Sequence, residues 1–255
     1  MTVWHPETYL KYSNIRFRAA YDLIAHIPLE RCERMYDLGC GTGHLTKALH
    51  ERWPEARVTG VDSSKEMLAN FRREFPEYEC IEGDISRWRP DAPADLLFSN
   101  AALQWVPDHE HLLPSLMGHV RRGGVFAIQM PRHIDSPGHL LLVETALEPR
   151  WRERLAPATL YMVVHTPEQY WRWLSPHAAS VEIWETIYLH ELEGGNPVVE
   201  FFRGTQLRPY IHLLPEAEAK EFVAAYAEKI ARAYPKQANG KTLLPFRRIF
   251  IVATR

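Results

Sequence analysis

The stretch that decides the fold is Asp37-Leu-Gly-Cys-Gly-Thr-Gly43. It follows the short apolar run Met35–Leu38 and precedes a helical pattern over Leu45–Trp53. Glycines at such a strand-to-helix turn adopt positive φ angles and let backbone amides approach a ligand. In a doubly wound sheet, the crevice at this turn is where ligands bind. The stretch therefore predicts an α/β fold with a ligand site at the first strand–helix turn.

Strand-like and helix-like segments alternate through the first two-thirds of the chain. The predicted strands are Met35–Leu38, Arg57–Val61, Glu79–Ile81, Ala94–Asn100 and Val125–Met130. The predicted helices between them are Leu45–Trp53, Lys65–Phe75 and His111–Val120. Regular alternation of this kind is typical of a doubly wound, mostly parallel sheet with right-handed crossovers.

The rhythm changes after Pro131. The predicted helices there are His139–Leu155, Pro167–Leu174 and Pro215–Tyr234, and the predicted strands are Val181–His190 and Arg248–Ala253. We interpret the late helices as insertions over the carboxyl edge of the sheet. The predicted organisation is one domain over 1–255, with an N-terminal helical cap segment at 1–28 and helical insertions at 132–178 and 192–245.

Composition narrows the class of protein. The chain is 46% hydrophobic and 24% charged with a net charge of -2, which excludes extensive disorder and a global attraction to nucleic acid or anionic membranes. Its three cysteines form no Cys-x-x-Cys pair, which argues against a zinc site and favours a reducing cytoplasm. No apolar run approaches the ~18 residues of a membrane span. We expect a cytoplasmic monomer without a metal.

The glycine stretch also discriminates between nucleotides. A dinucleotide fingerprint needs Gly-x-Gly-x-x-Gly, but here the third glycine comes one residue early and His44 takes its place. The carboxylate of Asp37 would repel a pyrophosphate and suits a cationic group such as the ammonium of a methionine moiety. A tight turn without a ligand remains the alternative at this point.

Two acids at the next strand ends support a nucleoside ligand. Asp62 ends the second strand, where a carboxylate can accept both ribose hydroxyls. Asp84 follows the third, where it can take an adenine amino group while Ile85 packs on the ring. Alone, Asp62 is as well explained as a helix N-cap and Asp84 as a turn residue. Acids at three successive strand ends are harder to explain as turns.

Together with Arg121–Pro131, these motifs resemble the motif series of class I methyltransferases. The resemblance implies a seven-stranded sheet whose last strand is antiparallel. It also implies S-adenosylmethionine as cofactor and S-adenosylhomocysteine as product. The residues expected to bind the cofactor are Asp37, Gly39, Gly41, Asp62, Ser63, Met67, Asp84, Ile85, Asn100, Ala101 and Trp105.

Three segments outside this motif series indicate the methyl acceptor. The opening Trp4-His-Pro-Glu-Thr-Tyr9, the segment Arg203-Gly-Thr-Gln-Leu-Arg-Pro209 and the closing Pro245-Phe-Arg-Arg248 resemble the trans-aconitate methyltransferases. One departure is Ala19, where that family leads us to expect proline. The resemblance implies esterification of one carboxylate of trans-aconitate, a planar tricarboxylate.

Side-chain chemistry is compatible with such an acceptor, because arginine binds carboxylates bidentately and tyrosine can donate to them. The residues expected to bind it are Tyr9, Tyr12, Arg16, Arg18, Gln104, His133, Arg203, Arg208, Tyr210 and Arg247. The alternative for each arginine is a surface ion pair, and for His133 a loop position without function.

No general base is predicted, because an acceptor carboxylate is already ionised. His109-Glu-His111 lacks the spacing of a zinc helix, and we interpret it as a solvated helix start. Three alternatives stay open: a methyltransferase for another small acceptor, a nicotinamide oxidoreductase, and a cofactor-binding protein without catalysis.

Overall fold

The computed structural model describes residues 13–160 and 162–255. Its sheet has seven strands in the order β3-β2-β1-β4-β5-β7-β6. The strands are β1 (Arg34–Leu38), β2 (Arg57–Asp62), β3 (Glu79–Glu82), β4 (Ala94–Asn100), β5 (Val120–Pro131), β6 (Ser180–Leu192) and β7 (Thr242–Thr254). The first five are mutually parallel, and β7 runs antiparallel to both β5 and β6. The predicted antiparallel last strand is confirmed.

The order of the strands creates a switch point between β1 and β4. The chain builds outward from β1 through β2 to β3, and then returns to place β4 on the other side of β1. The connections after these two strands therefore leave in opposite directions and open a crevice at their carboxyl ends. The glycine stretch lies at this point, directly after β1.

Helices cover both faces of the sheet. They are α2 (Ser13–Ala25), α3 (His44–Arg52), α4 (Lys65–Glu74), α5 (His109–Met117) and α8 (Pro167–Leu174). Alternate residues of each strand supply the two cores. Tyr36 and Leu97 face the core that contains α5 and α8, whereas Met35 and Leu96 face the core that contains α2 and α3. This alternation follows from the period-2 geometry of a strand.

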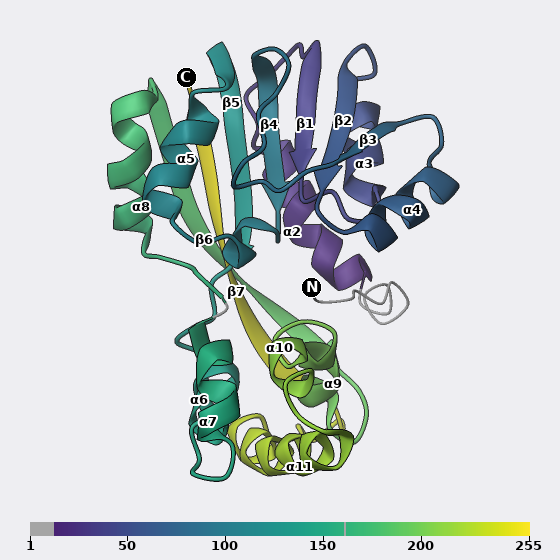
Figure 1. The fold of residues 1–255 in the computed structure, drawn as a ribbon, viewed down its shortest axis with the longest axis vertical. Helices are drawn as coiled ribbons and strands as arrows, with labels where there is room; N and C mark the ends of the chain where they lie inside the picture. The colour runs from purple at the N-terminus through teal and green to yellow at the C-terminus, as the bar shows by residue number, and fades with distance from the viewer. Residues whose placement is uncertain (1–12, 161) are drawn as a thin grey trace.

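A helical lobe lies beyond the carboxyl ends of the strands (Figure 1). Its helices are α6 (Pro137–Ala146), α7 (Arg152–Leu155), α9 (Pro197–Arg203), α10 (Arg208–Ile211) and α11 (Glu216–Ala233). The lobe has its own core, in which Leu142, Phe202 and Phe222 are fully buried. The hydroxyl of Tyr226 donates to the backbone oxygen of Gly138 (2.8 Å), which ties α11 to α6.

The long strands β6 and β7 carry the lobe. Residues 242–247 of β7 continue the pairing with β6 beyond Arg248, where the register of β5 with β7 ends. This ribbon runs from the sheet into the lobe (Figure 1). The predicted last strand, Arg248–Ala253, is too short, because β7 begins at Thr242. Short 3₁₀ turns at Leu103–Trp105, Ala156–Leu160 and Ser175–His177 complete the structure.

One predicted helix is in fact two separate helices. His139–Leu155 is divided into α6 and α7, with a break after Ala146. Pro149 lies inside the break, where it lacks an amide hydrogen and disfavours helical geometry for the residue before it. The predicted insertion 132–178 is also divided, because α8 packs against α5 on a face of the sheet rather than in the lobe.

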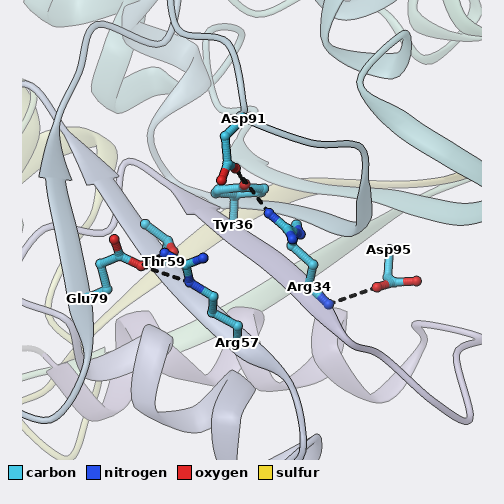
Figure 2. A network of polar contacts seen from close by, with 7 residues as sticks. All are labelled: Arg34, Tyr36, Arg57, Thr59, Glu79, Asp91 and Asp95. Atoms are coloured by element: carbon cyan, nitrogen blue, oxygen red, sulfur yellow. Dashed lines mark hydrogen bonds and ion pairs between the residues drawn. The ribbon is translucent and has the colours of Figure 1, made fainter.

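Polar contacts join the amino ends of β1, β2 and β3, at the edge of the sheet opposite the glycine stretch (Figure 2). Arg34 and the Tyr36 hydroxyl both donate to Asp91 Oδ1, at 3.1 and 2.5 Å. Arg57 donates to Glu79 across the β2–β3 pair at 2.8 Å. These side chains stabilise an edge that faces away from the crevice.

Across residues 13–160 and 162–255, no helix is both long and apolar enough to cross a membrane.

Candidate active site

The glycine stretch forms a loop between β1 and α3. Gly39 has a φ of +80°, and a Cβ there would lie 2.1 Å from the Cβ of Ala102, in the turn after β4. Gly41 has a φ of +56°, and a Cβ there would meet nothing within 4 Å. Gly39 therefore lets the loop pack tightly on the β4 turn, while Gly41 borders open space that a ligand can occupy.

Asp37 lies beneath this loop and is 2% exposed. The Thr46 hydroxyl donates to its Oδ2 at 2.7 Å. Burial raises the pKa of Asp37 to about 7, an effect that the Thr46 hydrogen bond partly offsets. The carboxylate is therefore close to the boundary between its two protonation states, and a cation nearby would favour the ionised one.

Asp62 at the end of β2 holds the loop from the side. Its carboxylate accepts hydrogen bonds from the amides of Gly41 (2.9 Å) and Ser64 (2.8 Å). Burial raises the pKa of Asp62. The N-cap of α4 is Ser64, whose hydroxyl accepts from the amide of Met67, so the N-cap alternative for Asp62 does not hold. Each carboxylate oxygen has further lone pairs for a ligand hydroxyl.

The other residues expected around the cofactor divide by exposure. Ile85 is buried and lies 3.7 Å from the position that a Gly39 Cβ would take, so it borders the loop. Asp84 is exposed, and the amide and hydroxyl of Ser86 donate to its Oδ1, which lowers its pKa. Ser63 is exposed next to Asp62, whereas Met67 is buried in α4.

A cavity opens between the sheet edge and the lobe. Its lining comes from the β4 turn, the segment after β5, the end of α9 and β7, and includes Asn100, Gln104, His133, Gln206, Phe246 and Arg248. Ala101 and Trp105 also line it, so the β4 turn that contacts Gly39 forms one wall of this cavity. The glycine loop and the cavity are thus adjacent.

Buried polar atoms gather around this cavity. Several have no hydrogen-bond partner among the described residues: Asn100 Oδ1, Gln104 Oε1, both ring nitrogens of His133 and both amide ends of Gln206. Buried polar groups are nearly always paired, because an unpaired one costs about 1–3 kcal/mol. Such a cluster indicates a ligand that brings hydrogen-bonding groups of its own.

His133 is 2% exposed in the cavity wall. Its ring lies 4.4 Å from that of Phe246 and stacks on Phe202 at 5.9 Å. Burial, together with the nearby His139 and Arg248, holds the pKa of His133 well below its usual range. The imidazole is neutral at pH 7 and offers one donor and one acceptor. His133 thus lies in the loop after β5, with its ring buried in the cavity wall.

Arg248 is a charged cavity residue that the sequence analysis did not predict. It is buried, its guanidinium lies 4.6 Å from the centre of the Phe246 ring, and its Nη1 lies 3.4 Å from Gln129 Oε1. Arg247 points to the other side of β7 and pairs with Asp135 at 2.8 Å. Period-2 alternation puts the two arginines on opposite sides of β7, but both sides carry buried residues, so the sequence pattern alone does not choose between them.

Other predicted acceptor residues lie outside the lining. Arg203 is about half exposed and pairs with Glu200 at 3.1 Å. Arg18 is exposed on α2, with its guanidinium 5.3 Å from the centre of the Tyr188 ring. The structure thus brings Gln104 and His133 to the cavity but not these two arginines or Arg247.

Arg208 and Tyr210 both belong to α10 and are buried. Arg208 Nε lies 3.3 Å from His212 Nε2. Tyr210 lines a smaller cavity that adjoins the one described above. The predictions for Tyr9 and Tyr12 lie outside the described residues, as does the side chain of Arg16.

The prediction of a solvated His109 is wrong. His109 is 1% exposed, with Nδ1 3.0 Å from the Tyr170 hydroxyl and Nε2 2.9 Å from the Leu103 carbonyl. It ties α8 to the turn that carries Gln104. His111 does lie at the surface, paired with Asp108 at 2.7 Å.

Comparison with known proteins agrees with this geometry. A model of the methyltransferase domain family matches residues 35–124. The chain is 46% identical to a trans-aconitate 2-methyltransferase of Azoarcus sp. (strain BH72) and 44% identical to one of Rhodopseudomonas palustris (strain BisB18), over the full length of all three chains. The chain belongs to the trans-aconitate 2-methyltransferase family.

Solved structures share the fold of this methyltransferase at low identity. The YcgJ protein of Bacillus subtilis has a TM-score of 0.62 at 16% identity, covering 93% of this chain and 97% of its own. A phosphoethanolamine N-methyltransferase of Haemonchus contortus, solved in complex with S-adenosyl-L-methionine, has a TM-score of 0.55 at 15% identity, covering 93% of this chain and 52% of its own. The predicted class I methyltransferase fold is confirmed.

Proposed function

We propose that this enzyme transfers a methyl group from S-adenosylmethionine to one carboxylate of trans-aconitate, forming a monomethyl ester and S-adenosylhomocysteine. The observation that carries the proposal is the contact between the two sites. The cavity with its unpaired polar atoms shares the β4 turn with the glycine loop, where Gly39 lies against Ala102. The full-length relatives, which are trans-aconitate 2-methyltransferases, supply the identity of the acceptor.

The residues at the crevice fit the cofactor. Gly41 leaves open space, and the Asp62 carboxylate beside it keeps lone pairs for ribose hydroxyls. The Asp37 carboxylate provides negative charge beneath the loop for a cationic ligand. Asp84 and Ile85 lie at the next strand end, where they would hold and cover the base. Ser63, Met67, Asn100, Ala101 and Trp105 complete the proposed cofactor set.

Arg248 and His133 are proposed to hold the acceptor. Arg248 is the arginine among the lining residues, and a guanidinium binds a carboxylate through two parallel hydrogen bonds. The neutral His133 can donate one N–H to a second carboxylate. Phe246 lies against both the His133 ring and the Arg248 guanidinium. Gln104, Arg208 and Tyr210 would shape the surrounding walls.

S-adenosylmethionine, when bound, supplies a methyl group activated by a positively charged sulfur. The acceptor carboxylate is ionised at neutral pH and carries its own lone pair, so no side chain has to remove a proton. The chain's contribution is alignment, which can supply about 7–11 kcal/mol when reactants are held as near-attack partners. Fixed donors such as Arg248 and His133 also replace the water that a desolvated carboxylate loses.

The direct test is a transfer assay with methyl-labelled S-adenosylmethionine and a panel of di- and tricarboxylates. Mass spectrometry should find one added methyl ester on trans-aconitate. Turnover of another acid without turnover of trans-aconitate would overturn the acceptor and keep the reaction class. Absence of methyl transfer to every acid, with S-adenosylmethionine still bound, would favour a binding protein.

We also propose that the enzyme is a monomer and that it works in the reducing environment of the cytoplasm. Cys32, Cys40 and Cys80 are buried free thiols, which supports a reducing compartment. Sedimentation of the purified protein tests the oligomeric state, and a mass of twice the 29.6 kDa of the chain would contradict a monomer.

A further inference from the structure

A second, smaller cavity adjoins the acceptor cavity. It is lined by His139, Leu142, Ala158, Pro209 and Tyr210, together with Thr159 and three residues that also line the larger one. The shared residues are Trp105, Met162 and Gln206. These three side chains therefore form the partition between the two compartments.

Gln206 is the polar member of this partition with no partner in the described structure. It is 6% exposed, and both ends of its amide lack a hydrogen-bond partner among the described residues. The backbone around it is fixed, because the amide of Leu207 donates to Phe202 O (3.0 Å) and that of Arg208 to Thr205 O (3.2 Å). The side chain thus stands on a rigid turn with an unused donor and an unused acceptor.

The smaller compartment does not suit a carboxylate. Its described lining contains no lysine or arginine. Burial lowers the pKa of His139, so that ring is neutral at pH 7. An ionised group without a paired cation is strongly disfavoured in such surroundings, whereas Leu142, Ala158 and Tyr210 offer an apolar surface. An apolar chain is the occupant that these walls favour.

We propose that Gln206 determines acceptor specificity by closing this apolar compartment and donating its amide N–H to the carboxylate arm of the acceptor farthest from the methyl donor. The inference rests on the proposed function, because it assigns Gln206 to the same acceptor. If so, Gln206 alone determines which arm length and polarity the enzyme accepts.

The test compares trans-aconitate with 2-butylfumarate, which keeps two carboxylates and replaces the carboxymethyl arm by an apolar chain. Gln206→Ala removes the donor and opens the partition. We expect kcat/KM for trans-aconitate to fall by about tenfold or more, since a hydrogen bond to a charged group is lost. We expect kcat/KM for 2-butylfumarate to rise by about tenfold, because an apolar pocket becomes accessible.

Gln206→Leu separates the two roles, because it keeps the bulk and removes the amide. It should lose trans-aconitate turnover as Gln206→Ala does, without gaining turnover of 2-butylfumarate. Gln237→Ala is the matched control, since Gln237 is an exposed glutamine in the turn before β7. Calorimetric binding of S-adenosylhomocysteine and thermal unfolding establish that each variant is folded.

A wild-type selectivity ratio in folded Gln206→Ala would overturn the inference. If that variant does not fold, Gln206→Leu decides: a reduced kcat/KM for trans-aconitate supports the hydrogen bond, and an unchanged one overturns it. Failure of the proposed function is a different result, namely that the wild-type enzyme does not methylate trans-aconitate at all.

Discussion

The glycine loop takes its shape from one continuous stretch, Asp37–Gly43, whereas the acceptor cavity draws its lining from segments between Asn100 and Arg248. The loop depends on positive φ angles, which the residue type alone nearly determines. The cavity depends on how the β6–β7 ribbon places the lobe over the sheet edge (Figure 1). One site is a local property of the chain and the other is a tertiary one.

This difference has a functional consequence. Changes in the loop should affect cofactor binding alone, and changes in the cavity should affect the acceptor alone, with the β4 turn as the shared wall.

The largest effect is expected from Gly39→Ala. The new methyl group would meet Ala102 Cβ at 2.1 Å, and the φ of +80° is unfavourable for alanine. The affinity for S-adenosylhomocysteine should fall by about 100-fold, a loss equivalent to roughly 3 kcal/mol. Calorimetry on the folded variant measures this loss.

Gly240→Ala is the matched control, because Gly240 has a similar φ of +77° and open space around it. It should show the backbone strain without the loss of affinity. Wild-type affinity in Gly39→Ala would contradict the role given to the packing of the loop on the β4 turn.

Arg248→Ala tests the acceptor cavity. Loss of a bidentate charged contact should lower kcat/KM for trans-aconitate by about 30-fold, while the affinity for S-adenosylhomocysteine stays unchanged. Arg247→Ala removes the neighbouring arginine, which pairs with Asp135 at the surface, and should have little effect on either quantity. The reverse ranking of the two variants would assign the acceptor to the other face of β7.

The pH dependence of cofactor binding tests Asp37. Its pKa is about 7 in the structure, so the carboxyl is mostly protonated at pH 6. A cationic ligand favours the ionised form, so binding releases a proton and affinity rises with pH. Affinity for S-adenosylmethionine should increase about tenfold from pH 6 to pH 8. In Asp37→Asn this increase should be lost, and an unaltered pH profile would show that Asp37 does not titrate on cofactor binding.

The smallest effect is expected at the opposite edge of the sheet. Tyr36→Phe removes the hydroxyl that donates to Asp91 (Figure 2). Kinetic constants should stay at their wild-type values, with a slight decrease in Tm. A marked decrease in kcat would show that the amino edge influences the site and that the two-region comparison is incomplete.

Much of the sheet half could be predicted from the sequence. Ala94–Asn100 and Pro167–Leu174 have the predicted bounds, because the first is a continuous apolar strand and the second begins with a capping threonine and a proline. The loop and the acids at its neighbouring strand ends lie together because parallel strands share one carboxyl edge. These features depend on local periodicity and on chain order.

The acceptor half was less accessible to sequence reasoning. Arg247 and Arg248 are adjacent and identical in type, and only the register of β7 decides which one faces the cavity. Gln206 had no local signal, since its importance comes from the two cavities that meet at its side chain. The burial of His109 had no local signal either, because its partner Tyr170 belongs to a helix 61 residues away in the sequence.

The most direct measurement is a crystal structure of the enzyme with both S-adenosylhomocysteine and trans-aconitate. We expect the nucleoside beside Gly41 and Asp62, and the acid between Arg248, His133 and Gln206 with one carboxylate toward the β4 turn. A well-occupied acid bound at the surface arginines Arg203 or Arg247, with the cavity left to solvent, would contradict it.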